Sequence, residues 1–231
     1  MATVLVTGVN RGIGLEFCRQ YAEAGWKVLA CCRRPAQASD LEGLAIHYPA
    51  ISIHQLELGN FGQIDALAHA LASEAIDVLI NNAGVYGDGA RNVPGDIDYE
   101  LWTQVMRINA LAPVKMTEAF LPHIARGGRK LVVAITSLMG SMGDNSSGGA
   151  IMYRSSKAAL NAAMKSLSID LGSRGIGVLI LHPGWVKTDM GGTNAPTSPA
   201  ESVAGLRRVI DGFSPRDSGH FLDFRGRELP W

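Results

Sequence analysis

Residues 3–14, TVLVTGVNRGIG, join a short β-branched and aliphatic run to a loop that contains three glycines. Thr3–Thr7 has the composition of a buried strand, and the stretch Gly12–Ala24, followed by Gly25, has the pattern of an amphipathic helix. Glycines at such a turn let an anion approach the N–H groups at the start of the helix, where side chains would block it. The Gly-x-x-x-Gly-x-Gly spacing differs from the usual Gly-x-Gly-x-x-Gly, and glycine-rich turns also occur without a ligand, but the position after the first strand favours a phosphate loop.

The alternation of short apolar runs and longer amphipathic stretches continues along the whole chain. Further strands are predicted at Lys27–Cys32, Ile51–Leu56, Asp77–Asn81, Lys130–Thr136, Ile176–Leu181 and His220–Asp223. Further helices are predicted at Ser39–Tyr48 with Ser39 as the N-cap, and at Phe61–Ser73, Tyr99–Ala125, Ala150–Leu171 and Pro199–Asp211. Strands that are hydrophobic throughout and alternate with helices indicate a parallel sheet covered on both faces. No linker or repeat divides residues 1–231, so we expect one doubly wound α/β domain of the Rossmann type, with about seven strands.

Composition narrows the class of protein. Of the 231 residues, 47% are apolar and 18% charged, and 21 Lys and Arg balance 21 Asp and Glu, which argues against nucleic-acid or anionic-membrane binding. Cys18, Cys31 and Cys32 cannot form a disulfide framework and are expected to be buried reduced thiols, and no cluster has metal-ligand spacing. The N-terminus lacks the features of a signal peptide, and the apolar runs are too short to span a bilayer, so we expect a cytoplasmic protein.

The end of the second predicted strand bears on the choice of cofactor. An acidic residue there would bind the ribose hydroxyls of NAD, but the chain reads Cys31-Cys32-Arg33-Arg34. A guanidinium suits the geometry of a 2′-phosphate, and Arg11 in the glycine loop offers a second cation. The alternative is that Arg33 and Arg34 form only a solvated turn. The pattern favours NADP(H) and leaves NAD(H) possible.

A tyrosine and a lysine four residues apart, Tyr153 and Lys157, lie near the start of a predicted helix, so they share one face. A phenol has an ordinary pKa of about 10, which makes it a poor proton donor or acceptor near neutral pH. A nearby ammonium stabilises the phenolate and is expected to lower the pKa of Tyr153. The spacing alone is common on ordinary helix faces.

With the other motifs in order along nearly the whole chain, the sequence resembles the short-chain dehydrogenase/reductase family. The glycine loop resembles the family's cofactor loop, and Asn81-Asn82-Ala83-Gly84 resembles its motif after strand four. His182-Pro183-Gly184-Trp185-Val186-Lys187-Thr188 resembles its Pro-Gly segment. The catalytic tetrad of the family matches Asn109, Ser137, Tyr153 and Lys157, although Ser137 taken alone is compatible with a strand-end turn and Asn109 with a helix kink.

The resemblance implies a role for each of these residues. Tyr153 gives its proton to a carbonyl oxygen, Ser137 hydrogen-bonds that oxygen, Lys157 also binds the nicotinamide ribose, and Asn109 holds a water of a proton relay. Thr188 holds the nicotinamide amide. The cofactor contacts implied are Gly8, Asn10, Arg11, Gly12, Ile13, Gly14, Arg33, Glu57, Leu58, Asn82, Ala83, Gly84, Tyr153, Lys157, Pro183, Gly184, Val186 and Thr188.

Two features depart from the family pattern. Glu57 stands where the family usually has an aspartate that contacts the adenine. The substrate lid is brief, at residues 189–198, and its glycines and prolines suit either a mobile flap or an ordinary solvent loop. Within the family, the glycine loop, the short lid and the ending Gly226–Trp231 are most similar to the C-factor and sniffer-type carbonyl reductases.

The expected reaction is reduction of an aldehyde or ketone by NADPH in an apolar pocket. Candidate substrate contacts are Tyr86, Leu138, Met139, Trp185 and Met190, each equally compatible with ordinary packing. The alternatives are an NAD-linked alcohol dehydrogenase, and a dinucleotide-binding signalling protein with little turnover. By analogy with the family we expect a homodimer or homotetramer built through the helices Tyr99–Ala125 and Ala150–Leu171.

Overall fold

A seven-stranded parallel sheet forms the centre of the molecule in a computed structural model that describes residues 1–89 and 94–231. The strand order is β3-β2-β1-β4-β5-β6-β7, and every neighbouring pair is parallel. The strands are β1 (Thr3–Thr7), β2 (Lys27–Cys32), β3 (Ile51–Gln55), β4 (Val78–Asn81), β5 (Leu131–Ile135), β6 (Gly177–His182) and β7 (Phe221–Asp223). The order reverses between β1 and β4, which is where doubly wound sheets bind their ligands. The predicted fold class is confirmed.

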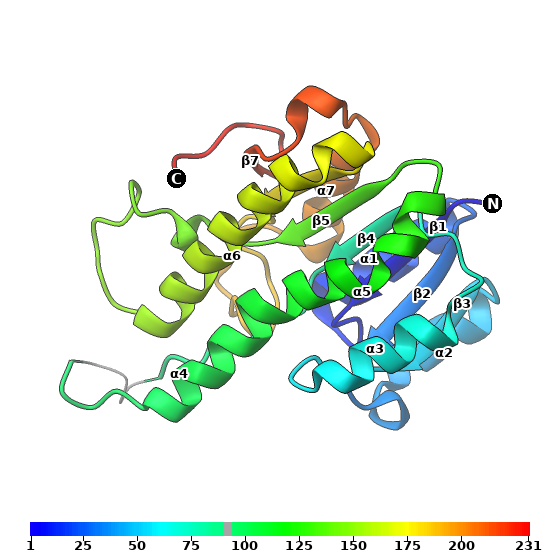
Figure 1. Cartoon of the computed structure of the whole chain (residues 1–231). Helices are drawn as coiled ribbons and strands as arrows, with labels where there is room; N and C mark the ends of the chain where they lie inside the picture. Colours follow the sequence, from blue (N-terminus) through cyan, green and yellow to red (C-terminus); the bar gives the residue numbers. More distant parts are fainter. Residues whose placement is uncertain (90–93) are drawn as a thin grey trace.

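Helices cover both faces of the sheet because successive strand residues point to opposite sides. Val4 and Val6 of β1 pack with α1 (Gly12–Glu23), α2 (Ser39–His47) and α7 (Pro199–Asp211). Leu5 points the other way, into a second core shared by α3 (Phe61–Ala70), α5 (Ala112–Arg126) and α6 (Ile151–Asp170). Figure 1 shows α5 and α6 crossing one face of the sheet, with α4 (Tyr99–Met106) leading into α5. No helix in the described part of the chain is long and apolar enough to cross a membrane.

The predicted boundaries are mostly one to three residues too long, with two larger differences. Ser39 is the first residue of α2, whereas Ala38 is its N-cap and makes no side-chain cap, so the predicted cap is wrong. The helix predicted at Tyr99–Ala125 is interrupted by a π-helical turn at Arg107–Leu111. Such a turn admits one extra residue per turn and often marks a functional site.

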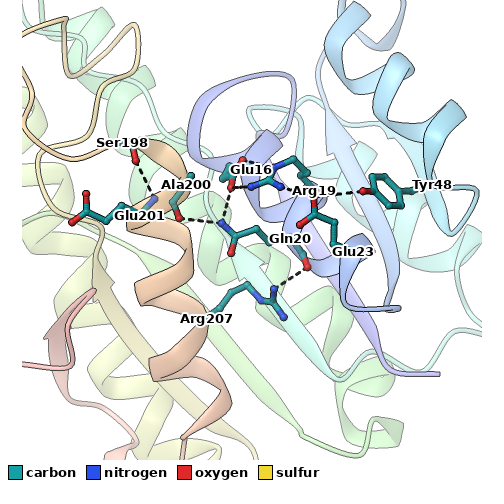
Figure 2. Close-up of polar contacts among 9 residues, drawn as sticks. All are labelled: Glu16, Arg19, Gln20, Glu23, Tyr48, Ser198, Ala200, Glu201 and Arg207. Carbon is teal, nitrogen blue, oxygen red and sulfur yellow. Dashed lines mark hydrogen bonds and ion pairs between the residues drawn. The ribbon is translucent and has the colours of Figure 1, made fainter.

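Polar contacts join α1, which follows the glycine loop, to α7, which follows the predicted lid (Figure 2). Gln20 donates from Nε2 to the carbonyl oxygen of Ala200 at 3.1 Å, and Arg207 donates from Nη1 to the carbonyl oxygen of Gln20 at 2.8 Å. Ser198 caps α7 by accepting from the Glu201 N–H at 3.1 Å. These bonds hold the end of the lid against the helix that starts at the glycine loop.

Candidate active site

One cleft of about 1080 Å³ opens along the carboxyl ends of the strands. It includes every cofactor contact predicted above, together with Ser137, Tyr153 and Lys157. The five candidate substrate contacts, Tyr86, Leu138, Met139, Trp185 and Met190, also line it. Asn109 is the exception among the predicted site residues, because its side chain lies behind the wall of the cleft.

The glycine loop is packed so closely that no side chain fits at Gly8 or Gly14. Gly8 has φ +72°, and a Cβ there would lie 2.7 Å from Ala83 Cα. A Cβ on Gly14 would lie 2.1 Å from the carbonyl oxygen of Gly8. Asn82 fixes the same loop by donating from Nδ2 to the carbonyl oxygens of Thr7 at 2.8 Å and Gly8 at 3.2 Å. The two motifs therefore brace each other at the point where β1 and β4 end.

The start of α1 has the donors that an anionic phosphate needs. Its N-cap, Arg11, makes no side-chain cap and the first turn holds no acid, so the first N–H groups remain available. Gly12, with φ +57°, faces Thr188 across the cleft, and a Cβ there would lie 3.1 Å from Thr188 Cγ2. Arg11 itself pairs through Nη1 with Asp189 Oδ2 at 2.5 Å, so its guanidinium already bridges the glycine loop and the lid. These features fit the pyrophosphate of a dinucleotide.

Arg33 lies at the far end of the same cleft, just after β2. Its side chain is 63% exposed, and its Nε lies 3.7 Å from Glu57 Oε2. The other oxygen of Glu57 accepts from the Gly59 N–H at 3.2 Å, which fixes the carboxylate. The residue that replaces the usual aspartate therefore pairs with the cation expected to bind a 2′-phosphate.

Tyr153 and Lys157 lie one turn apart on α6 and are both buried. Lys157 donates from Nζ to the carbonyl oxygen of Ile135 at 3.0 Å and lies 5.7 Å from the centre of the Tyr153 ring. Burial lowers the pKa of Lys157 to about 8. Burial also raises the pKa of Tyr153 to about 12, with a hydrogen bond from Ser137 opposing the shift and the nearby Tyr86 adding to it.

The expectation that the ammonium lowers the pKa of Tyr153 is therefore wrong for this structure. Loss of water around the phenol disfavours its anion and is the largest cause of this shift, and Lys157 is not among the groups that shift the pKa of Tyr153. Tyr153 consequently keeps its proton at neutral pH. This is the protonation state that a proton donor requires.

Asn109 lies in the π-helical turn and is fully buried. Its Oδ1 accepts from the Val85 N–H at 2.8 Å, and its Nδ2 donates to the carbonyl oxygen of Val85 at 2.8 Å and to Ser156 Oγ at 3.0 Å. The side chain thus joins the loop after β4 to α6. Asn109 therefore lies where the α-helix is interrupted, and both ends of its amide are hydrogen-bonded.

Two polar residues of this region are not singled out by any sequence motif. Ser156 donates from Oγ to the carbonyl oxygen of Tyr153 at 2.8 Å, and Asp88 accepts from the Tyr153 N–H at 2.7 Å. His182 ends β6 and lines the cleft, and burial lowers its pKa to about 4, so the imidazole is neutral. Asp88 lies 65 positions before Tyr153, so spacing carries no signal for it, and Ser156 lies between Tyr153 and Lys157 but matches no position of the tetrad.

Hydrogen bonds fix both ends of the short lid, residues 189–198, to the segment before it. Lys187 donates its N–H to the carbonyl oxygen of Thr197 at 2.9 Å, and Trp185 donates from Nε1 to that of Gly191 at 2.7 Å. The hydroxyl of Thr188 accepts from the Gly191 N–H at 3.1 Å. These bonds favour an ordered loop over a freely mobile flap.

Comparison with known proteins agrees with this geometry. A family model described as short chain dehydrogenase matches residues 2–198, and the chain belongs to that family. It is 48% identical over 166 residues to the C-signal protein of Myxococcus xanthus. The matched stretch covers 72% of this chain and 99% of that protein. It is 34% identical to 1-hydroxy-2-glutathionyl-2-methyl-3-butene dehydrogenase of Rhodococcus sp., over the full length of both.

Solved structures give the same result. The carbonyl reductase Sniffer of D. melanogaster superimposes with a TM-score of 0.93 at 33% identity over all of both chains. The NADPH-bound carbonyl reductase from chicken fatty liver gives a TM-score of 0.92 at 35% identity, covering 100% of this chain and 99% of that one. The resemblance stated from the motifs, including the subgroup, is confirmed.

Proposed function

We propose that this protein reduces the carbonyl group of an aldehyde or ketone with NADPH. The observation that carries the proposal is a buried Tyr153 beside Lys157, at one end of a cleft whose other end presents Arg33. When bound, NADPH supplies the hydride. The NADPH or NADP named in the structures of related reductases supports this cofactor, as does the lack of an acid directly after β2.

The side chains divide the remaining work. Tyr153 holds the proton that the carbonyl oxygen needs, and Ser137 donates a hydrogen bond to the same oxygen as negative charge develops. The ammonium of Lys157 is positively charged below about pH 8. It stabilises the negative charge that develops on the carbonyl oxygen and lies on the far side of the phenol from it. Asn109 keeps the loop after β4 and the catalytic helix in register. Val186 and Thr188 line the cleft, which supports a role for them in orienting the nicotinamide side of the cofactor.

The substrate end of the cleft is apolar. Tyr86 is 39% exposed, Trp185 57% and Met190 50%, and they surround the mouth together with Leu138 and Met139. Such a rim favours neutral, hydrophobic carbonyl compounds, because burial of apolar surface contributes roughly 25 cal/mol per Å².

A second candidate is a cell-to-cell signalling role, because of the 48% identity to the C-signal protein. A protein that only binds a dinucleotide has no chemical need for the buried Tyr153 and Lys157. An NAD-linked alcohol dehydrogenase is the remaining alternative, and cofactor preference separates it from the reductase.

We also propose a homo-oligomer that uses α5 and α6. Leu111 is 51% exposed beside α5 and Ile169 is 70% exposed on α6, which supports contact there. The free, buried cysteines support a reducing, cytoplasmic location.

The test is to mix the purified protein with NADPH, or separately with NADH, and follow the loss of absorbance with a panel of aldehydes, ketones and quinones. Turnover with NADPH that collapses in Tyr153→Phe supports the reductase. Cofactor binding without turnover on the panel would favour the signalling candidate. Faster turnover with NADH than with NADPH would favour the NAD-linked enzyme.

A further inference from the structure

The catalytic helix α6 begins without a cap of its own. Its N-cap residue, Ala150, is in the left-handed region at φ +45° and makes no side-chain hydrogen bond. A helix start leaves four N–H groups without intrahelical partners. Asp88, far earlier in the chain, supplies the missing acceptors: Oδ1 accepts from Met152 at 3.2 Å and Oδ2 from Tyr153 at 2.7 Å. These are the second and third helical residues, whose N–H groups an N-cap side chain ordinarily satisfies.

The loop that carries Asp88 is itself held in place. Both backbone groups of Val85 bond to the side chain of Asn109, each at 2.8 Å. Gly87, at φ +75°, passes so close to α4 that a Cβ would lie 2.3 Å from Val105 Cγ2. The ring of Tyr86 packs 5.0 Å from that of Tyr153, centre to centre. Asp88 therefore reaches α6 from a fixed position.

Both backbone polar groups of Tyr153 are therefore hydrogen-bonded to side chains. Its N–H donates to Asp88, and its carbonyl oxygen accepts from Ser156 Oγ, which in turn accepts from Asn109 Nδ2 at 3.0 Å. We propose that Asp88 is a positioning residue for the reaction: its carboxylate caps α6 from the loop after β4 and sets where the Tyr153 hydroxyl lies in the cleft. The catalytic part of this inference rests on the proposed function.

The test compares Asp88→Ala and Asp88→Asn with Asp98→Ala. Asp98 is a matched control, because it caps α4 by accepting from the Leu101 N–H at 2.9 Å, and α4 also packs on α6. We expect Asp88→Ala to lower kcat about tenfold, because a phenol that is held less firmly adopts the reacting geometry less often, with the KM for NADPH within about twofold. Asp88→Asn keeps one acceptor oxygen and should recover part of kcat. Asp98→Ala should leave kcat unchanged.

Hydrogen exchange supplies a readout that does not depend on activity. Asp88→Ala should speed exchange of the amides of residues 151–154, whereas Asp98→Ala should speed exchange only in α4. Unchanged exchange at residues 151–154 in Asp88→Ala would overturn the cap. An equal loss of kcat in Asp98→Ala would overturn the specific role of Asp88 in positioning Tyr153. A wild-type protein without turnover on any carbonyl would instead overturn the proposed function, since the exchange result stands separately. If Asp88→Ala does not fold, Asp88→Asn is measured in the same two assays and judged by the same outcomes.

Discussion

Replacement of Arg33 by alanine should weaken binding of NADPH and leave binding of NADH nearly unchanged. The guanidinium is 63% exposed, so its attraction to a phosphate acts in a mostly aqueous environment. Two unit charges 4 Å apart interact by about 1 kcal/mol in water, which gives about 2 kcal/mol for a doubly charged 2′-phosphate. Binding of the phosphate also disturbs the exposed ion pair between Arg33 and Glu57. Loss of such a pair costs about 0–1 kcal/mol and so reduces the net gain from the phosphate.

The net effect is therefore about 1–2 kcal/mol, or roughly a 5- to 30-fold rise in the Kd of NADPH. The assay is fluorescence titration of each cofactor at one fixed ionic strength, because added salt screens the interaction. Arg174→Ala is the matched control: it removes the same charge from an exposed arginine outside the cleft. Arg33→Asp should go further and shift the preference toward NADH.

An unchanged Kd for NADPH in Arg33→Ala would refute the assignment of this arginine to the 2′-phosphate. An equal loss for NADPH and NADH would also refute it, since NADH lacks the phosphate. With an unchanged Kd, Arg33 would be only part of a solvated turn, whereas an equal loss would place it at a part that both cofactors share. In either case Arg11 and Arg34 would have to account for cofactor preference.

Other consequences follow from the same geometry. Tyr153→Phe should lower kcat by about 100-fold or more with the Kd of NADPH within about twofold, as measured by steady-state kinetics and titration; a small loss would mean another proton donor. The kcat/KM for NADPH should fall as pH rises through about 8, because Lys157 has a lowered pKa of about 8 and loses its charge there; a pH profile flat to pH 10 would contradict this reasoning. Gly14→Ala should cost about 1–3 kcal/mol of stability, because its Cβ would lie 2.1 Å from the Gly8 carbonyl oxygen. A melting temperature equal to that of wild type would show that the loop can relax.

The fold and the residues that line the cleft could be predicted because each depends on a short stretch of chain. The run TVLVTGVNRGIG specifies a strand, a turn and a helix within twelve residues, and Tyr153 and Lys157 are neighbours on one helical turn. The pKa of Tyr153 could not be predicted from that spacing. Its value depends on how much water the folded cleft leaves around the phenol, and burial is the largest cause of its rise.

Positioning in this site depends on contacts between distant segments. The N–H of Tyr153 is held by a residue 65 positions earlier, and Asn109 reaches Ser156 across 47 positions. A carboxylate or an amide can serve these contacts from any loop that folds close enough, so no fixed spacing marks them in a sequence. Chemistry restricts the residue type at the reacting group, whereas positioning restricts only where a hydrogen-bond acceptor or donor lies. For this reason two members of the family can share Tyr153 and Lys157 in kind and still differ in how firmly the phenol is held, and substitutions such as Asp88→Ala are expected to change kcat without any contact to substrate.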